Sequence, residues 1–173
     1  MLFRIAGTFL ILAGSAGLGL YFSAKEGFRV QDLLEFKKAL LILSSEIEYM
    51  RSTLSEACAN ISKRTSLGVS RIFARFSELL AEGEGETAYR LWLAAMEENR
   101  DAVHLAAEDI AVLGDFGKTL GYLDKQMQKN AIDYAVSYID EKSAVLSASS
   151  DKNKRMYRSL GVIGGLMIAV VLW

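Results

Sequence analysis

The chain has 173 residues, a formal net charge of −1, no proline and one cysteine. This length suits one domain with a real core, the near-neutral charge argues against a large field that attracts nucleic acid, and a single cysteine excludes an internal disulfide. The absence of proline, together with many helix-forming residues, predicts an all-α protein.

The chain begins with a predicted membrane anchor. No charged residue occurs from Ile5 to Phe22, and a run of this length is near the lower end of the ~17–25 residues that span a bilayer as a helix. Cleavage after Ala24 would place the large Phe22 where a signal peptidase needs a small residue. We therefore interpret residues 1–24 as an uncleaved transmembrane anchor.

Residues 25–158 are predicted to form an antiparallel helical bundle that starts with a long apolar seam. Spacings of three and four residues, typical of one helix face, continue for several turns. We expect Leu34 and Leu41 to widen this face towards a globular core. Thr53-x-x-Glu56 has the spacing of a capping box and predicts the start of a second helix. The seam positions are Leu33, Phe36, Leu40, Leu43, Ile47, Met50, Leu54, Ala57 and Ile61.

Two shorter helices should follow, separated by polar turns. Residues 63–68 form the first predicted turn, and a second amphipathic stretch runs from Val69 to Leu80. The Gly- and Glu-rich residues 81–86 then predict a solvated loop, because they lack the Gly-Lys-Ser/Thr ending of a phosphate cradle. A short helix over 88–96 precedes Asp101, the candidate N-cap of the next helix.

That next helix is expected to end in a tight corner near Gly121. Its predicted apolar face is Val103, Ala106, Ile110, Leu113, Gly117 and Leu120. Glycines 114, 117 and 121 indicate a close helix crossing or a helix end, and we expect Phe116 and Leu120 in the core. Thr119 or Asp124 is a candidate cap for the following helix. Asp124 and Gln128 could serve either as structural groups or as contacts with a partner.

One long helix is predicted from Asp124 to Tyr157, and it leads into a second membrane segment. Its expected buried face is Leu123, Met127, Ile132, Ala135 and Ile139. The uncharged run from Leu160 to Trp173 is shorter than a typical span, and Arg158 could extend it by snorkelling. We interpret 159–173 as a C-terminal transmembrane helix.

Basic residues lie next to both predicted membrane segments on the side of the bundle domain. Since such residues favour the cytoplasm, both termini are expected on the opposite side. The basic residues are Lys25, Arg29, Lys152, Lys154, Arg155 and Arg158.

Residues that carry chemistry are scarce. His104 is the single histidine, whereas metal sites generally need several ligands together. Cys58 has no base that the sequence places beside it, and a free cysteine is commonly a small buried apolar residue. We therefore expect no enzyme, cofactor, metal, nucleic-acid or small-molecule site. Two functional classes remain: a structural platform in a membrane assembly and a helical signalling adaptor. A sensor would usually have a sizeable region on the side of the membrane opposite the bundle domain, and very few residues are expected there, which favours the platform.

Three motifs in order resemble the stage III sporulation protein AB family. They are Glu46-Ile47-x-Tyr49 followed by Leu54-x-Glu56-Ala57; Phe116-Gly117-x-x-Leu120-Gly121-x-x-Asp124-x-x-x-Gln128; and Lys154-Arg155-Met156-Tyr157-Arg158-Ser159-Leu160-Gly161 followed by Gly164-Gly165. The family usually has Thr-Pro just before the leucine, where this chain has Ser52-Thr53. A softer break between the first two helices is therefore expected here.

The resemblance also implies a fold and a function. It implies a soluble part similar to the cytoplasmic domain of the type II secretion platform protein, the F component. The chain would belong to the channel apparatus between mother cell and forespore, in the outer forespore membrane, facing the mother-cell cytoplasm. Its implied partners are a secretion-type cytoplasmic ATPase and other membrane components, and homo-oligomerisation stays open. The candidate motif or interface residues are Glu46, Tyr49, Glu56, Phe116, Gly117, Leu120, Gly121, Asp124 and Gln128.

Overall fold

A computed structural model describes the backbone of residues 2–49, 53–83, 85–121 and 124–172. Side chains are described for residues 26–49, 53–66, 68–83, 85–121 and 124–149. Every regular element in these ranges is helical, which confirms the predicted all-α class. The chain divides into two compact units, residues 1–28 with 144–173 and residues 29–143.

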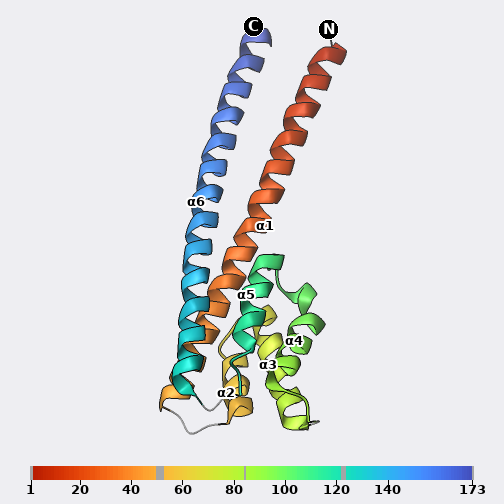
Figure 1. Cartoon of the computed structure of the whole chain (residues 1–173). Helices are drawn as coiled ribbons and strands as arrows, with labels where there is room; N and C mark the ends of the chain where they lie inside the picture. Colours follow the sequence, from red (N-terminus) through yellow and green to blue (C-terminus); the bar gives the residue numbers. More distant parts are fainter. Residues whose placement is uncertain (1, 50–52, 84, 122–123, 173) are drawn as a thin grey trace. The chain divides into compact units, whose positions relative to one another are not determined.

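The helices follow the order expected from the sequence (Figure 1). They are α1 (Leu2–Tyr49), α2 (Leu54–Ser62), α3 (Leu67–Glu82), α4 (Ala88–Glu98), the 3-10 helix η1 (Arg100–Ala102), α5 (Ala107–Gly117) and α6 (Lys125–Leu172). The capping box that predicted α2 is present, because Thr53 and Glu56 each bond the other's backbone N–H. Gly83 ends α3 in the left-handed conformation, as the glycine-rich loop predicted.

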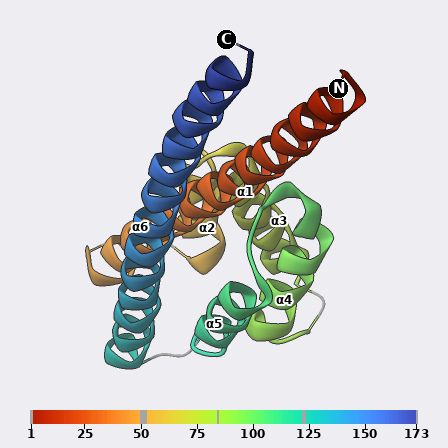
Figure 2. The same ribbon diagram turned by 90° about the horizontal axis from the view of Figure 1, so that it is seen from above.

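Within the 29–143 unit, α1 and α6 are antiparallel. Lys37 of α1 pairs with Asp140 at 2.6 Å, whereas Glu48, later in α1, lies near Lys129, earlier in α6. α3 and α4 lie beside α1 on the side away from α6 (Figures 1 and 2). α2 packs along α3, α3 along α4, and α4 against α5. The first and last helices of the bundle, α1 and α6, thus lie side by side.

The core of this unit is centred on Trp92 of α4. Its indole is fully buried, with ring centroids 5.3 Å from those of Phe73 and Phe76 and 5.9 Å from that of Phe116. The described seam of α1 faces the same core, since Leu33, Phe36, Leu40 and Leu43 are at most 1% exposed. Ile47 is only half-buried near the end of α1, and Met50 lies outside the described residues.

Leu34, Leu41 and Met127 are not buried, contrary to the prediction. Leu34 and Leu41 do not widen the buried face of α1: they are 47% and 49% exposed, and the small Ala39 is buried instead. On α6, Met127 is 45% exposed and Gln128 is buried in its place. Ile132, Ala135 and Ile139 are buried as predicted, while Leu123 lies outside the described residues.

The start of α5 also differs from the prediction. Asp101 is not an N-cap, because it lies in η1 and the chain stays extended at Val103 before α5 begins at Ala107. The cap comes from inside the helix: the Asp109 carboxylate accepts a hydrogen bond from the Ala106 N–H at 2.8 Å. A buried carboxylate therefore decides where this helix begins.

The two predicted membrane segments lie outside the residues whose side chains are described. Among the described residues, no helix combines the length and apolar character needed to cross a membrane. The backbone of α1 includes the uncharged run of residues 5–22, and that of α6 continues through Arg158 to Leu172.

Candidate interaction surface

The first two sequence motifs lie at the same end of the 29–143 unit, the lower end in Figure 1. The last turn of α1 and the first turns of α6 approach each other there, with Glu48 Oε2 3.6 Å from Lys129 Nζ. A small cleft of about 170 Å³ separates them, lined by Ile47 and Gln126 among others. Motifs separated by some seventy positions in the sequence therefore share one end of the bundle.

The corner after α5 is built by close packing on Trp92. The indole Nε1–H donates to the Leu113 carbonyl at 2.8 Å, and Phe116 packs edge-on against the ring. The backbone of Gly117 lies directly against the indole. A Cβ at this position would overlap Cδ1 and come within 2.9 Å of Nε1. This glycine is therefore needed for a close approach between α5 and α4.

The turn itself occurs at Gly121, as predicted. Its φ of +84° lies in the left-handed region that favours glycine. Phe116 and Leu120, 3% and 5% exposed, face the core as expected. Thr119 is buried and donates its hydroxyl to the Phe116 carbonyl, so it closes α5 and does not cap α6.

Asp124 is the cap of α6. Its Oδ1 accepts from the N–H groups of Gln126 at 2.9 Å and Met127 at 3.1 Å, while the residue remains exposed. Gln128 is 9% exposed and lies on the buried side of the same helix. The structural role of Asp124 is clear from these bonds, and a contact with a partner stays a prediction for both residues.

The three candidate residues of the first motif lie in different environments: one is buried, one is exposed and one caps a helix. Glu46 is 7% exposed and Tyr49 is 78% exposed, while Glu56 bonds the Thr53 N–H in the capping box. Glu46 also lines a groove between α1 and the end of α2. Of these three side chains, Tyr49 is the one most available to a partner.

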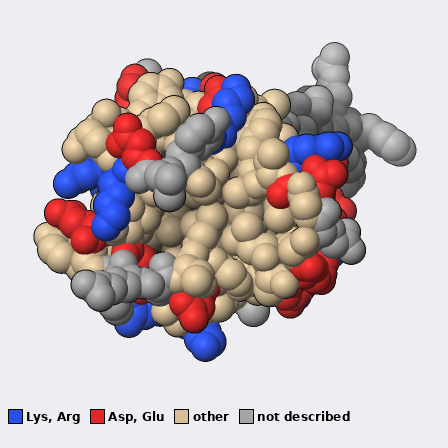
Figure 3. Space-filling model, turned by 60° about the horizontal axis from the view of Figure 1, so that its bottom comes forward, with Lys and Arg blue, Asp and Glu red and all other residues tan. Residues whose placement is uncertain are grey.

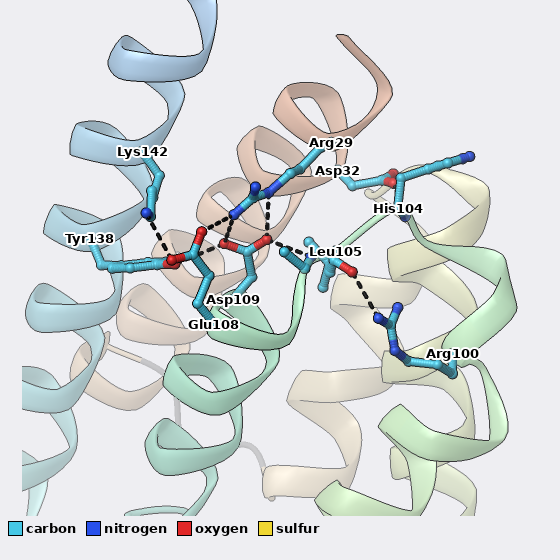
Figure 4. A network of polar contacts seen from close by, with 10 residues as sticks. Arg29, Asp32, Arg100, His104, Leu105, Glu108, Asp109, Tyr138 and Lys142 are labelled. Atoms are coloured by element: carbon cyan, nitrogen blue, oxygen red, sulfur yellow. Dashed lines mark hydrogen bonds and ion pairs between the residues drawn. The ribbon is translucent and has the colours of Figure 1, made fainter. Parts of the chain in front are cut away.

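A buried ionic cluster, missed by the sequence analysis, connects three helices (Figure 4). The side chain of Asp109 on α5 is 0% exposed. It accepts from Arg29 Nε at 2.8 Å and Arg29 Nη2 at 2.9 Å, and from the Tyr138 hydroxyl at 2.8 Å. Because Arg29 lies on α1 and Tyr138 on α6, one carboxylate joins both long helices to α5.

A second carboxylate extends the cluster to the surface. Glu108 accepts from Arg29 at 2.6 Å and pairs with Lys142 of α6 at 2.9 Å. These bonds from Arg29 and Lys142 lower the pKa of Glu108. The bond to Asp109 raises the pKa of Arg29, and burial followed by that carboxylate's hydrogen bond raises the pKa of Tyr138. All three groups therefore hold their neutral-pH charge states more firmly than free side chains.

A sequence signal for this cluster existed. Asp109, Leu113, Phe116 and Leu120 recur at four, three and four residues, so Asp109 is on the buried stripe of α5. A charged residue on such a stripe is rarely buried without a partner. The assumed apolar face, which passed through Ala106 and Ile110, was slightly rotated, because both residues are only half-buried.

The single cysteine and the single histidine differ in burial. Cys58 is fully buried, and burial raises its pKa to about 12. His104 is 48% exposed, and its Nδ1 lies 3.0 Å from Asp32 Oδ2. Among the described residues there is no group of three or more His, Cys, Asp or Glu side chains that could hold a metal.

The surface that Figure 3 shows, with the bottom of Figure 1 brought forward, has a broad central area without charged side chains. Lysines, arginines and acidic residues alternate around its edge. On the described part of this face, basic and acidic side chains are therefore mixed and form no single basic or acidic patch.

Comparison with known proteins gives the family. The family model described as Stage III sporulation protein AB matches residues 4–173. The chain belongs to this family. It is 27% identical over 169 residues to Stage III sporulation protein AB of Bacillus subtilis (strain 168), covering 98% of each chain. A solved structure of Stage III sporulation protein AB is similar with a TM-score of 0.67 and 27% identity, covering 72% of this chain and 97% of that one.

Family membership confirms the resemblance carried by the three motifs. The chain is therefore a member of a family of sporulation proteins with a helical fold. The roles of the individual motif residues at an interface stay predictions.

Proposed function

We propose that the chain is a non-enzymatic platform component of the channel apparatus between mother cell and forespore. Residues 1–24 and 159–173 anchor it in the outer forespore membrane, and residues 25–158 face the mother-cell cytoplasm. This bundle domain links a secretion-type cytoplasmic ATPase to the membrane proteins of the channel.

The observation that carries the proposal is the buried cluster around Asp109. α1 and α6 contain the two uncharged runs of the sequence, and the same two helices supply Arg29 and Tyr138 to one carboxylate. A fully paired buried charge is costly to separate. The cluster therefore joins the two helices that carry the predicted membrane segments to α5 of the bundle, which supports the platform role.

The first test concerns the membrane and its sides. The chain should stay with the membrane fraction and be released only by detergent. A reporter that works only in the cytoplasm should be active when inserted into the exposed loop at Gly83 and Gly85. Release of the chain by salt, or activity in that loop only from an extracytoplasmic reporter, would contradict the proposed placement.

The second test concerns the partner. The tagged full-length chain, solubilised from sporulating cells with detergent, should co-purify with the cytoplasmic ATPase. As a control, a variant that keeps the tag and both terminal segments but lacks residues 29–143 should lose the ATPase and stay in the membrane. Retention of the ATPase by this variant would show that the bundle domain is not the linking part.

A further inference from the structure

A groove of about 630 Å³ lies on the 29–143 unit between α1 and the C-terminal end of α2. Leu34 and Leu41 of α1 line it, about half exposed at 47% and 49%. They are two helical turns apart, or ~10 Å at 1.5 Å per residue. Lys38 and Ser45 continue the same exposed stripe at intervals of three and four residues.

The leucines are set apart from the core of their own bundle. Leu33 and Leu40, one position earlier in each case, are fully buried, and successive residues of an α-helix are about 100° apart around its axis. Leu34 and Leu41 therefore keep much of their apolar surface in water, where it stabilises nothing in the unit. Neighbouring exposed apolar side chains within a groove are typical of interaction sites.

The charges around the leucines are mainly basic. Lys38, Lys63 and Arg64 line the groove, and Lys63 and Arg64 are exposed. Within the described part of the chain, neither of these two has an acidic group at ion-pair distance, whereas Lys37 on the same groove is paired with Asp140. Lys38 lies 3.8 Å from Glu35, and Glu46, the acid that lines the groove, is 7% exposed. The exposed charges of the groove without such a partner, Lys63 and Arg64, are therefore both positive.

We propose that this groove binds an acidic amphipathic helix of another protein of the channel apparatus. Apolar residues of that helix, at i, i+3 or i+4 and i+7, contact Leu34 and Leu41. Its Asp and Glu residues face Lys38, Lys63 and Arg64, which favours this partner over a neutral or basic helix. The identity of the partner as a channel component rests on the proposed function.

The shape of the site favours a helix over an anionic bilayer surface. A helix with its side chains is ~10–12 Å wide and can enter a groove with walls on α1 and α2. A bilayer surface is broad and would touch only the outermost side chains. Leucines beside unpaired basic residues within a concave site therefore point to a peptide partner.

Photocrosslinking in sporulating cells of the native host tests this inference. The full-length chain carries a photoreactive phenylalanine analogue at position 41, or at the exposed control position 111 on α5. We expect position 41, and not position 111, to capture a segment of another protein with apolar residues on one helical face and acids beside it. Sequencing of the crosslinked peptide decides this.

Charge reversal gives the matched comparison. Lys63→Glu with Arg64→Glu should reduce the adduct at position 41 by about tenfold or more, as expected for close charge pairs. Arg71→Glu with Arg90→Glu changes net charge equally at exposed sites outside the groove and should leave the adduct unchanged. Lysines in place of the acids of the captured helix should restore crosslinking to the Lys63→Glu, Arg64→Glu protein.

Four results would overturn the inference: an adduct with lipid alone, an adduct with a second copy of this chain, capture of a helix without acids, or equal loss in both charge-reversed proteins. If the ATPase co-purifies but no acidic helix is captured, the groove inference fails and the proposed function stands. If an acidic helix is captured but no channel protein co-purifies, the proposed function fails and the groove inference stands.

Discussion

Replacing Gly117 by alanine tests whether the corner depends on close packing against Trp92. Alanine usually favours a helix over glycine by roughly 0.5–1 kcal/mol, so a purely local view expects Gly117→Ala to stabilise α5. The structure predicts the reverse, because the new Cβ would overlap the indole of Trp92. That ring is fully buried, contacts three phenylalanines and donates to the Leu113 carbonyl.

The expected magnitude follows from these contacts. Overpacking of a core costs typically ~1–3 kcal/mol, and an indole N–H that loses its buried acceptor costs about 1–3 kcal/mol more. With the helix preference subtracted, Gly117→Ala should lower the free energy of unfolding by roughly 1–5 kcal/mol.

Gly114→Ala on the same helix is the matched control. Its Cβ would lie 3.4 Å from Leu93 Cδ2, an ordinary contact, so this change should be neutral or stabilising by up to about 1 kcal/mol. Urea unfolding of the full chain in detergent should be followed through tryptophan fluorescence. Trp173→Phe in all proteins leaves Trp92 as the single reporter. Equal stability of the two alanine variants would refute the packing argument.

Three further outcomes follow from the buried groups. Asp109→Ala should destabilise the bundle by about 3–5 kcal/mol, since it strands Arg29 and Tyr138, whereas Glu108→Ala should have a much smaller effect; thermal unfolding compares them. Because folded Tyr138 has a raised pKa, its stability contribution is complete below the ordinary tyrosine pKa of 10.0 and falls at higher pH. Tyr138→Phe should therefore reduce the loss of stability between about pH 10 and 11, and an unchanged pH profile would contradict this assignment. Cys58, buried with a pKa of about 12, should react with a thiol reagent at pH 8 only after unfolding, and rapid labelling of the folded chain would be inconsistent with its burial.

The helical class and most element boundaries can be predicted from the amino-acid sequence alone. Proline is absent, apolar residues recur at helical spacing, and the strongest local signals were correct: the Thr53–Glu56 capping box, the Asp124 cap and the turn at Gly121. These features depend on residues close in sequence, so their physics is visible without the fold. The motifs also identified the family.

Which face of each helix is buried, and which contacts hold the helices together, depends on the packing of the folded chain. Leu34 and Leu41 look like core residues from their spacing. In the folded chain, however, α1 buries Leu33 and Leu40, and Leu34 and Leu41 line the groove on the surface. Asp109 has no nearby sequence partner for its charge, because Arg29 is eighty positions away. A carboxylate is stable in the core only when folding brings a guanidinium and a hydroxyl to it, so only the folded chain reveals this cluster.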